Sequence, residues 1–145
     1  MIGRFNHLLI AALVVAHLLI SLCWYSPFLF GYKWINVSNF QLSAVPPYNS
    51  IAFYWPFLVS IVNSIVFCYA LAYLFMRLSI QNLWQGVLIG FALWFTFVFL
   101  FTLSHHQFAQ QELALTLIDT GRDLVVVLLS SLTLAVFSRR NGSHE

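Results

Sequence analysis

The sequence has very few charged residues for its length. Of its 145 residues, six are lysine or arginine and four are aspartate or glutamate, together 7% of the chain. A soluble domain carries about 25% charged residues, because charged side chains cover its surface. This scarcity excludes an ordinary soluble globular protein and a disordered chain. It also excludes a nucleic-acid-binding protein, which needs a dense basic patch.

The sequence also lacks the motifs of catalytic, cofactor and metal sites. There is no glycine loop for phosphate, no Cys-x-x-Cys-His for attached haem and no zinc-like Cys/His spacing. In a membrane bundle His17 and His106 would differ in depth by about 18–20 Å, which is too far for one haem iron. Cys23 and Cys68 would differ by about 10 Å, so we expect free thiols. We therefore expect no metal, no cofactor and no catalytic residue, and the sequence does not point to an enzyme.

Long hydrophobic runs dominate the chain instead. Hydrophobic residues make up 61% of it, and the mean hydropathy is +0.88. A membrane helix needs roughly 20 mostly apolar residues, and four stretches qualify: residues 8–27, 57–76, 84–103 and 118–137. We predict an all-α, polytopic membrane protein, in which residues 1–145 form a single domain of four transmembrane helices.

The basic residues predict the orientation of the four spans. Arg4, Arg77, Arg139 and Arg140 all lie on one side of the predicted spans, whereas only Lys33 lies on the other. Lysine and arginine in short loops stay in the cytoplasm. We therefore expect both termini to be cytoplasmic and the long first loop to face outward.

The first outer loop is too aromatic to be a solvated linker. We expect residues 28–40 to lie along the membrane surface, because tryptophan and tyrosine rings favour the interface between lipid and water. His105 and His106, after the third span, are interpreted as solvated interface residues. The aromatic residues at or near the outer boundary are Trp24, Tyr25, Tyr32, Trp34, Tyr48, Tyr54 and Trp55.

The end of the first span carries a distinctive motif. It reads Trp24-Tyr25-Ser26-Pro27-Phe28-Leu29-Phe30-Gly31-Tyr32-Lys33-Trp34. Seven of these residues resemble the signature of the domain of unknown function 1761 family, which comprises small bacterial proteins of four predicted membrane helices: Trp24, Tyr25, Ser26, Pro27, Phe30, Gly31 and Trp34. The segment 117–121, Leu-Ile-Asp-Thr-Gly, is also similar to the family. The resemblance implies a four-helix fold in the bacterial cytoplasmic (inner) membrane and no established activity.

The motif has two interpretations. Trp24, Tyr25 and Trp34 either anchor the helix end at the interface or form the wall of an outward-facing pocket. Pro27 favours a break in the helix, and Gly31 permits a bend.

Polar residues inside the spans are the candidate site. A charged residue at mid-bilayer costs roughly 2.5–3.5 kcal/mol and usually faces the bundle interior. Asp119 and Asp123 share a helix face, and Arg122 lies beside it. These three residues either form a local ion network that packs the bundle, or line an outward-open pocket with Asn63 and His17.

The leading functional hypothesis is a small membrane protein whose outward-facing polar pocket binds or passes a small solute or ion. The alternative is an accessory or structural subunit of a larger membrane complex. The expected surroundings are a lipid bilayer, with further copies of the chain or other membrane subunits as candidate protein partners.

Overall fold

The computed structural model describes residues 6–80 and 82–142. All regular secondary structure in these residues is helical. α4, η2 and α5 follow one another without a break and form one long helix, in which η2 is a π-helical segment. The elements are α1 (His7–Trp24), α2 (Gly31–Val37), η1 (Leu42–Ala44), α3 (Ile51–Arg77), α4 (Leu83–Leu93), η2 (Trp94–Phe99), α5 (Leu100–Phe108) and α6 (Leu113–Gly142).

Four helices are long and apolar enough to cross a membrane, which confirms the predicted fold class. The last three are longer than predicted, because hydropathy marks only the apolar part of a helix that continues into its polar flanks. α3 even begins before Pro56, which lies inside the helix. The first span ends earlier than predicted, just before the Ser26-Pro27 break. The four helical spans are His7–Trp24, Ile51–Arg77, Leu83–Phe108 and Leu113–Phe137.

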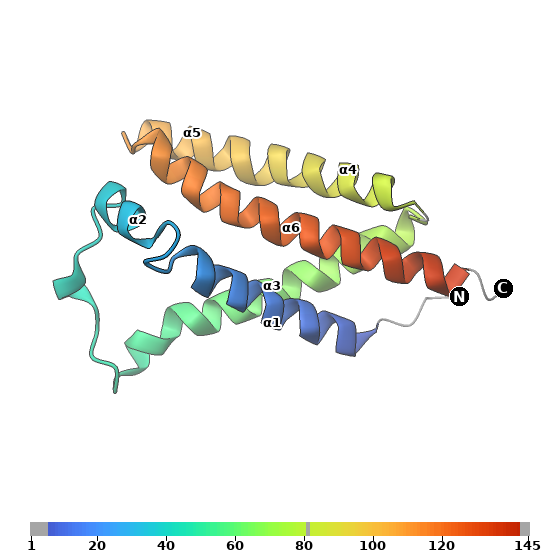
Figure 1. Ribbon diagram of the computed structural model, residues 1–145, viewed down its shortest axis with the longest axis horizontal. Helices are drawn as coiled ribbons and strands as arrows, with labels where there is room; N and C mark the ends of the chain where they lie inside the picture. The colour runs from blue at the N-terminus through green and yellow to red at the C-terminus, as the bar shows by residue number, and fades with distance from the viewer. Residues whose placement is uncertain (1–5, 81, 143–145) are drawn as a thin grey trace.

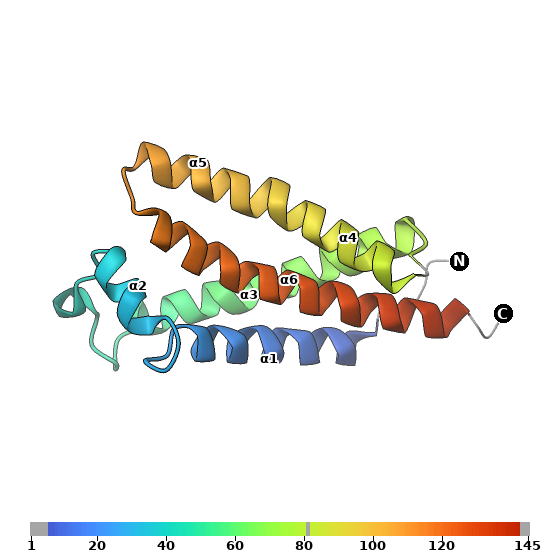
Figure 2. The ribbon, with the colours of Figure 1, turned by 45° about the horizontal axis from the view of Figure 1, so that its top comes forward.

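α6 is the central helix of the bundle. In two views it lies between α4 and α5 on one side and α1 and α3 on the other (Figures 1 and 2). Its membrane-spanning part is 39% buried, against 17–22% for the other three spans. The start of α1 and the end of α6 lie at one end of the bundle, which we call the termini end. α2 lies at the opposite end, which we call the α2 end (Figure 1).

Two glycines bring α4 close to α6. Gly86 and Gly90 are both buried and lie one helical turn apart. A Cβ atom on Gly86 would lie 2.8 Å from the Cβ of Ala135, and one on Gly90 would lie 2.8 Å from the Cβ of Ser131. Small residues at four-residue spacing on both helices allow this close approach, as is common between membrane helices.

The apolar core lies toward the termini end, where α1, α3 and α6 meet. Cys68 is buried in this core and Cys23 is exposed, and both are free thiols as predicted. At the α2 end, polar and aromatic contacts join α1 and α2 to α6. The buried core residues are Ile10, Leu13, Val14, Cys68, Leu71, Ala72, Phe75, Ile80, Leu134 and Ala135.

Candidate functional site

The aromatic motif forms a closed turn between α1 and α2. The backbone N–H groups of Phe30 and Gly31 donate to the carbonyl oxygens of Trp24 and Ser26, at 3.1 and 3.0 Å. Gly31 is buried against the carbonyl groups of Tyr25 and Ser26, and a Cβ atom there would lie 2.8 Å from the Ser26 oxygen. The turn therefore requires glycine at position 31 because the backbone itself occupies the space of a side chain.

Three side chains of the motif reach α6. The indole N–H of Trp24 donates to the backbone oxygen of Ile118 at 2.9 Å. The Tyr25 hydroxyl and the Trp34 indole N–H both donate to Oδ1 of Asp119, at 2.8 and 3.0 Å. We call Trp24, Tyr25, Trp34 and Asp119 the Asp119 site. The motif at the end of α1 and the 117–121 segment, which are far apart in the sequence, are thus in direct contact.

The rest of the motif supports these contacts. The Phe30 ring packs on Trp24, with 4.7 Å between centroids. Gly121 leaves room for Trp24, since a Cβ atom there would lie 3.2 Å from the indole ring. The Ser26 hydroxyl donates to a carbonyl of the last turn of α1, and Pro27 is exposed on the turn.

Two neutral donors bind one oxygen of the Asp119 carboxylate. Burial raises the pKa of the Tyr25 phenol, and the nearby Asp119 carboxylate raises it further, so Tyr25 stays protonated as a donor. A hydrogen bond to a charged group contributes about 1.5–3 kcal/mol. The ion pair found in the described part of the chain does not include Asp119. Its negative charge is therefore stabilised by hydrogen bonds and not by a partner cation.

Arg122 forms an ion pair with its neighbour Asp123. Nη2 of Arg122 lies 2.7 Å from Oδ1 of Asp123, and the two side chains are 26% and 29% exposed. Nη1 donates to the Ser21 hydroxyl on α1 at 3.4 Å. Nε of Arg122 is buried and has no hydrogen-bond partner among the described residues. The guanidinium group thus links α6 to α1 and retains unused donor capacity.

His17 connects the same two helices one turn deeper. It is 2% exposed, and its Nε2 lies 2.7 Å from Oγ of Ser130. The Ser130 hydroxyl donates to the carbonyl of Val126 at 2.9 Å. Ser21 follows His17 by one turn and donates to the His17 backbone oxygen at 2.9 Å. Polar side chains therefore follow one another along the contact between α1 and α6, which we call the α1–α6 seam: His17, Ser21, Asp119, Arg122, Asp123 and Ser130.

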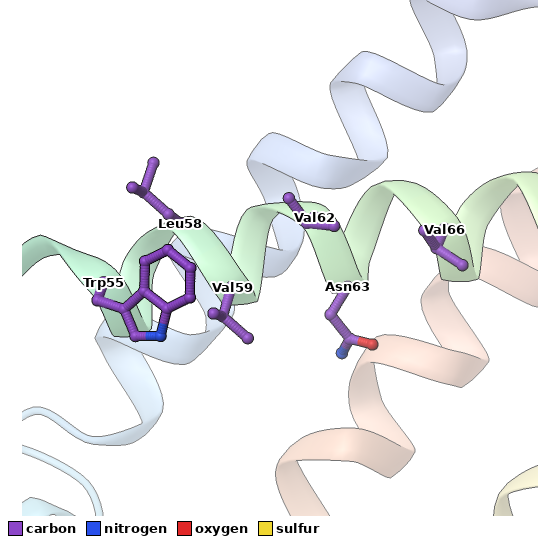
Figure 3. Close-up of a pocket in the computed structure, with 6 residues that line it drawn as sticks. All are labelled: Trp55, Leu58, Val59, Val62, Asn63 and Val66. Atoms are coloured by element: carbon purple, nitrogen blue, oxygen red, sulfur yellow. The ribbon is translucent and has the colours of Figure 1, made fainter.

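Asn63 does not belong to this seam. It is exposed on α3, and no hydrogen bond connects it to any other residue within 6–80 and 82–142. It lines a groove of about 440 Å³ whose other residues also come from α3 (Figure 3). Four of the five candidate residues thus lie along the contact between α1 and α6, whereas Asn63 lies on a separate surface.

Other polar contacts to α6 were not expected from the sequence. The buried Trp94, in η2, donates its indole N–H to the backbone oxygen of Thr120 at 2.8 Å. His106, interpreted as solvated, is instead half-buried, with Nδ1 2.9 Å from the Thr116 hydroxyl. For the first of these contacts the sequence does contain a signal, the tryptophan in the middle of a span, because its buried N–H needs an acceptor. The π-helical segment that carries Trp94 has no sequence signature.

The titratable residues do not gather into a metal site. Among the residues that the structure describes, no three His, Cys, Asp or Glu side chains are placed to hold a metal ion. The groups around Asp119, Arg122 and Asp123 are carboxylate oxygens, the Arg122 guanidinium group, the Ser21 hydroxyl and the aromatic donors Tyr25 and Trp34.

Four membrane-capable helices, three of which pack around the more polar α6 (Figures 1 and 2), define a small multi-pass membrane protein. The chain belongs to the family described as protein of unknown function (DUF1761), whose model matches residues 8–135 and so includes both contacting motifs. The suspected family is thereby confirmed. Searches of curated proteins and of solved structures returned no match.

Proposed function

We propose that the protein binds a small solute or ion, and specifically a cation, at the α2 end of the α1–α6 seam. The charge balance supports this most directly. Asp119 and Asp123 against Arg122 leave one net negative charge on side chains that are only partly buried. Tyr25 and Trp34 both bind Oδ1 of Asp119, which leaves Oδ2 without a partner among the described hydrogen bonds. A cation at this oxygen would restore neutrality.

The packing between the ionic residues Asp119, Arg122 and Asp123 and the termini end supports binding of a solute in preference to its passage through the bundle. His17 is 2% exposed and Ser130 is fully buried, and the two are hydrogen-bonded across the seam. Further toward the termini end the space between the helices is filled by core residues such as Cys68 and Phe75. A solute that enters from the α2 end therefore meets a closed floor.

The contacts of Asp119 and Arg122 within the bundle support a binding role over the accessory-subunit alternative. An accessory subunit would present its ionic stripe to a partner, away from its own helices. Asp119 is instead held by Tyr25 and Trp34, and Arg122 reaches Ser21 on α1. These contacts keep the group within the chain's own bundle.

The proposed location is the cytoplasmic membrane of a bacterium, with the α2 end facing outward. Lys33 lies in α2, whereas Arg77 ends α3 near the opposite end of the bundle. Arg4 lies outside the described residues, and the side chains of Arg139 and Arg140 are likewise not described. The proposal for orientation therefore rests on the sequence asymmetry of basic residues.

Cysteine labelling tests this orientation. In a Cys23→Ser, Cys68→Ala background, a single cysteine at Ser43 should react with a membrane-impermeant maleimide on intact cells. A single cysteine at Ser143 should react only after the cells are opened. The opposite pattern would reverse the orientation.

Cation binding is the test of the proposed function. We expect the wild-type protein in nanodiscs to show a saturable change in tryptophan fluorescence with at least one class of cation, at constant ionic strength. The classes to titrate are alkali ions, Mg²⁺ and Ca²⁺, and ammonium ions from NH₄⁺ to tetramethylammonium. Asp119→Asn should weaken binding at least about tenfold, which corresponds to roughly 1.4 kcal/mol. The asparagine oxygen can still accept hydrogen bonds from Tyr25 and Trp34, so the fold of the site is retained.

Glu112→Gln is the matched control for Asp119→Asn. Glu112 is an exposed carboxylate just before α6, so its removal makes the same charge change outside the seam. This variant should bind as the wild type does. An equal loss in both variants, or no saturable response to any cation in the wild type, would contradict the proposed function.

A further inference from the structure

Asn63 lies deep within the membrane-spanning part of α3. The helix has 27 residues, from Ile51 to Arg77. At 1.5 Å per residue, Asn63 lies about 18 Å from the first residue and about 21 Å from Arg77. Since a hydrocarbon core is about 30 Å thick and Arg77 belongs at its edge, the Asn63 amide is inside it.

The Asn63 amide has no partner in its own chain among the residues that the structure describes. The side chain is exposed and points away from the helix axis into the groove beside Val59 and Val66 (Figure 3). None of the hydrogen bonds between described residues involves it. Hydrocarbon offers no water to satisfy an amide, so such a group needs a polar partner. That partner must come from outside this bundle.

The groove has the form of a helix-packing face. Trp55, Val59, Asn63 and Val66 follow one another at spacings of four, four and three residues, a pattern along which a second helix packs, so Asn63 belongs to the packing stripe itself. Leu58 and Val62 flank this stripe. The three valines have stiff, β-branched side chains, which lose little freedom when they are covered.

We propose that α3 of a second copy of this chain packs on this face, with the two Asn63 amides hydrogen-bonded to each other near a two-fold axis. A carboxamide is both donor and acceptor, so an identical group related by two-fold symmetry satisfies it in both directions. A lipid acyl chain could fill the groove, but it offers nothing to the amide. The face is apart from the Asp119 site, so this proposal is independent of cation binding.

Cysteine cross-linking in native membranes tests the face. In the Cys23→Ser, Cys68→Ala background, single cysteines at Val59, Val62 and Val66 should form oxidised dimers of twice the 16.7 kDa chain mass. Phe57→Cys is the control, because Phe57 is exposed on α3 but does not line the groove. Equal cross-linking at all four positions, none at any, or products only at other masses would overturn the proposal. The last result would indicate a different membrane subunit.

Asn63→Leu tests the amide itself. We expect self-association, measured by energy transfer between labelled copies diluted in liposomes, to weaken about tenfold, as expected for loss of a hydrogen bond between membrane helices. Thr96→Leu, another exposed polar residue in a span, should leave association unchanged. Thermal melting of the monomer in detergent should be the same for both variants, because Asn63 makes no contact that holds the bundle together. Wild-type association in Asn63→Leu would overturn the proposal.

Discussion

Gly90→Leu is expected to separate α4 from α6 and to lower the free energy of unfolding by about 3 kcal/mol, the upper range for overpacking. Even a single Cβ atom at position 90 would overlap the Ser131 side chain, whose Cβ would lie 2.8 Å away. The nearest atoms are Oγ and Cβ of Ser131, and this Cβ is fixed to the α6 backbone, so it cannot move aside unless the helix moves. Unfolding by SDS titration of the purified protein measures the loss.

Two further variants show whether helix spacing is the cause. Ala92→Leu makes a similar small-to-large change on the exposed side of α4 and should have little effect. Gly90→Ala should be milder than Gly90→Leu, and adding Ser131→Gly should restore much of its stability by removing the opposing Cβ atom. The Ser131 hydroxyl is buried without a partner among the described residues, so its loss carries no hydrogen-bond penalty. No rescue by Ser131→Gly would show that the two positions do not oppose each other.

Gly31→Ala should cost about 2–3 kcal/mol and loosen the Asp119 site, because the new methyl group meets the carbonyl groups of Tyr25 and Ser26. The turn would have to open, which moves Trp34 away from Asp119. Thermal melting should show the loss of stability. Trp34 fluorescence, measured against a Trp34→Phe variant, should shift to the red as the ring becomes more solvated.

Lys33→Ala is the control for Gly31→Ala. Lys33 lies in the same short helix and is exposed. Its replacement introduces alanine into α2 without touching the turn, so stability and fluorescence should stay close to wild type. A Gly31→Ala protein that is equally unaffected would contradict a steric requirement for glycine in this turn.

The spans could be predicted because hydropathy and helix length are local properties. Each of the four apolar runs forms a helix, with differences only at the ends. The Gly-x-x-x-Gly spacing of Gly86 and Gly90 is also local, and it is typical of close contacts between membrane helices. The aromatic motif that begins at Trp24 and the carboxylate Asp119 inside a span could each be recognised as candidate features from the sequence alone.

The pairing of these groups could not be predicted from depth alone. Asn63 and Asp123 fall at similar depth in their spans, yet Asn63 lines the groove on α3 and makes no hydrogen bond to the seam among the described residues. The contact of Trp34 with Asp119 depends on α2 folding back toward α6, which follows from the tight turn at Gly31. Helix rotation and chain reversal are set by packing between distant segments, and a single sequence does not contain that information in local form.

The central position of α6 has a consequence for biogenesis. Its span has the lowest hydropathy of the four, 1.6 against 2.1–2.3, and it carries Asp119, Arg122 and Asp123. Such a segment partitions from the translocon into lipid least readily. It leaves the ribosome after α1, α3 and α4 have been synthesised. The earlier helices therefore offer the hydroxyl, phenol and indole groups of Ser21, Tyr25, Trp34 and Trp94 to the arriving polar helix. The order of the helices along the chain is thus also a workable order of membrane insertion.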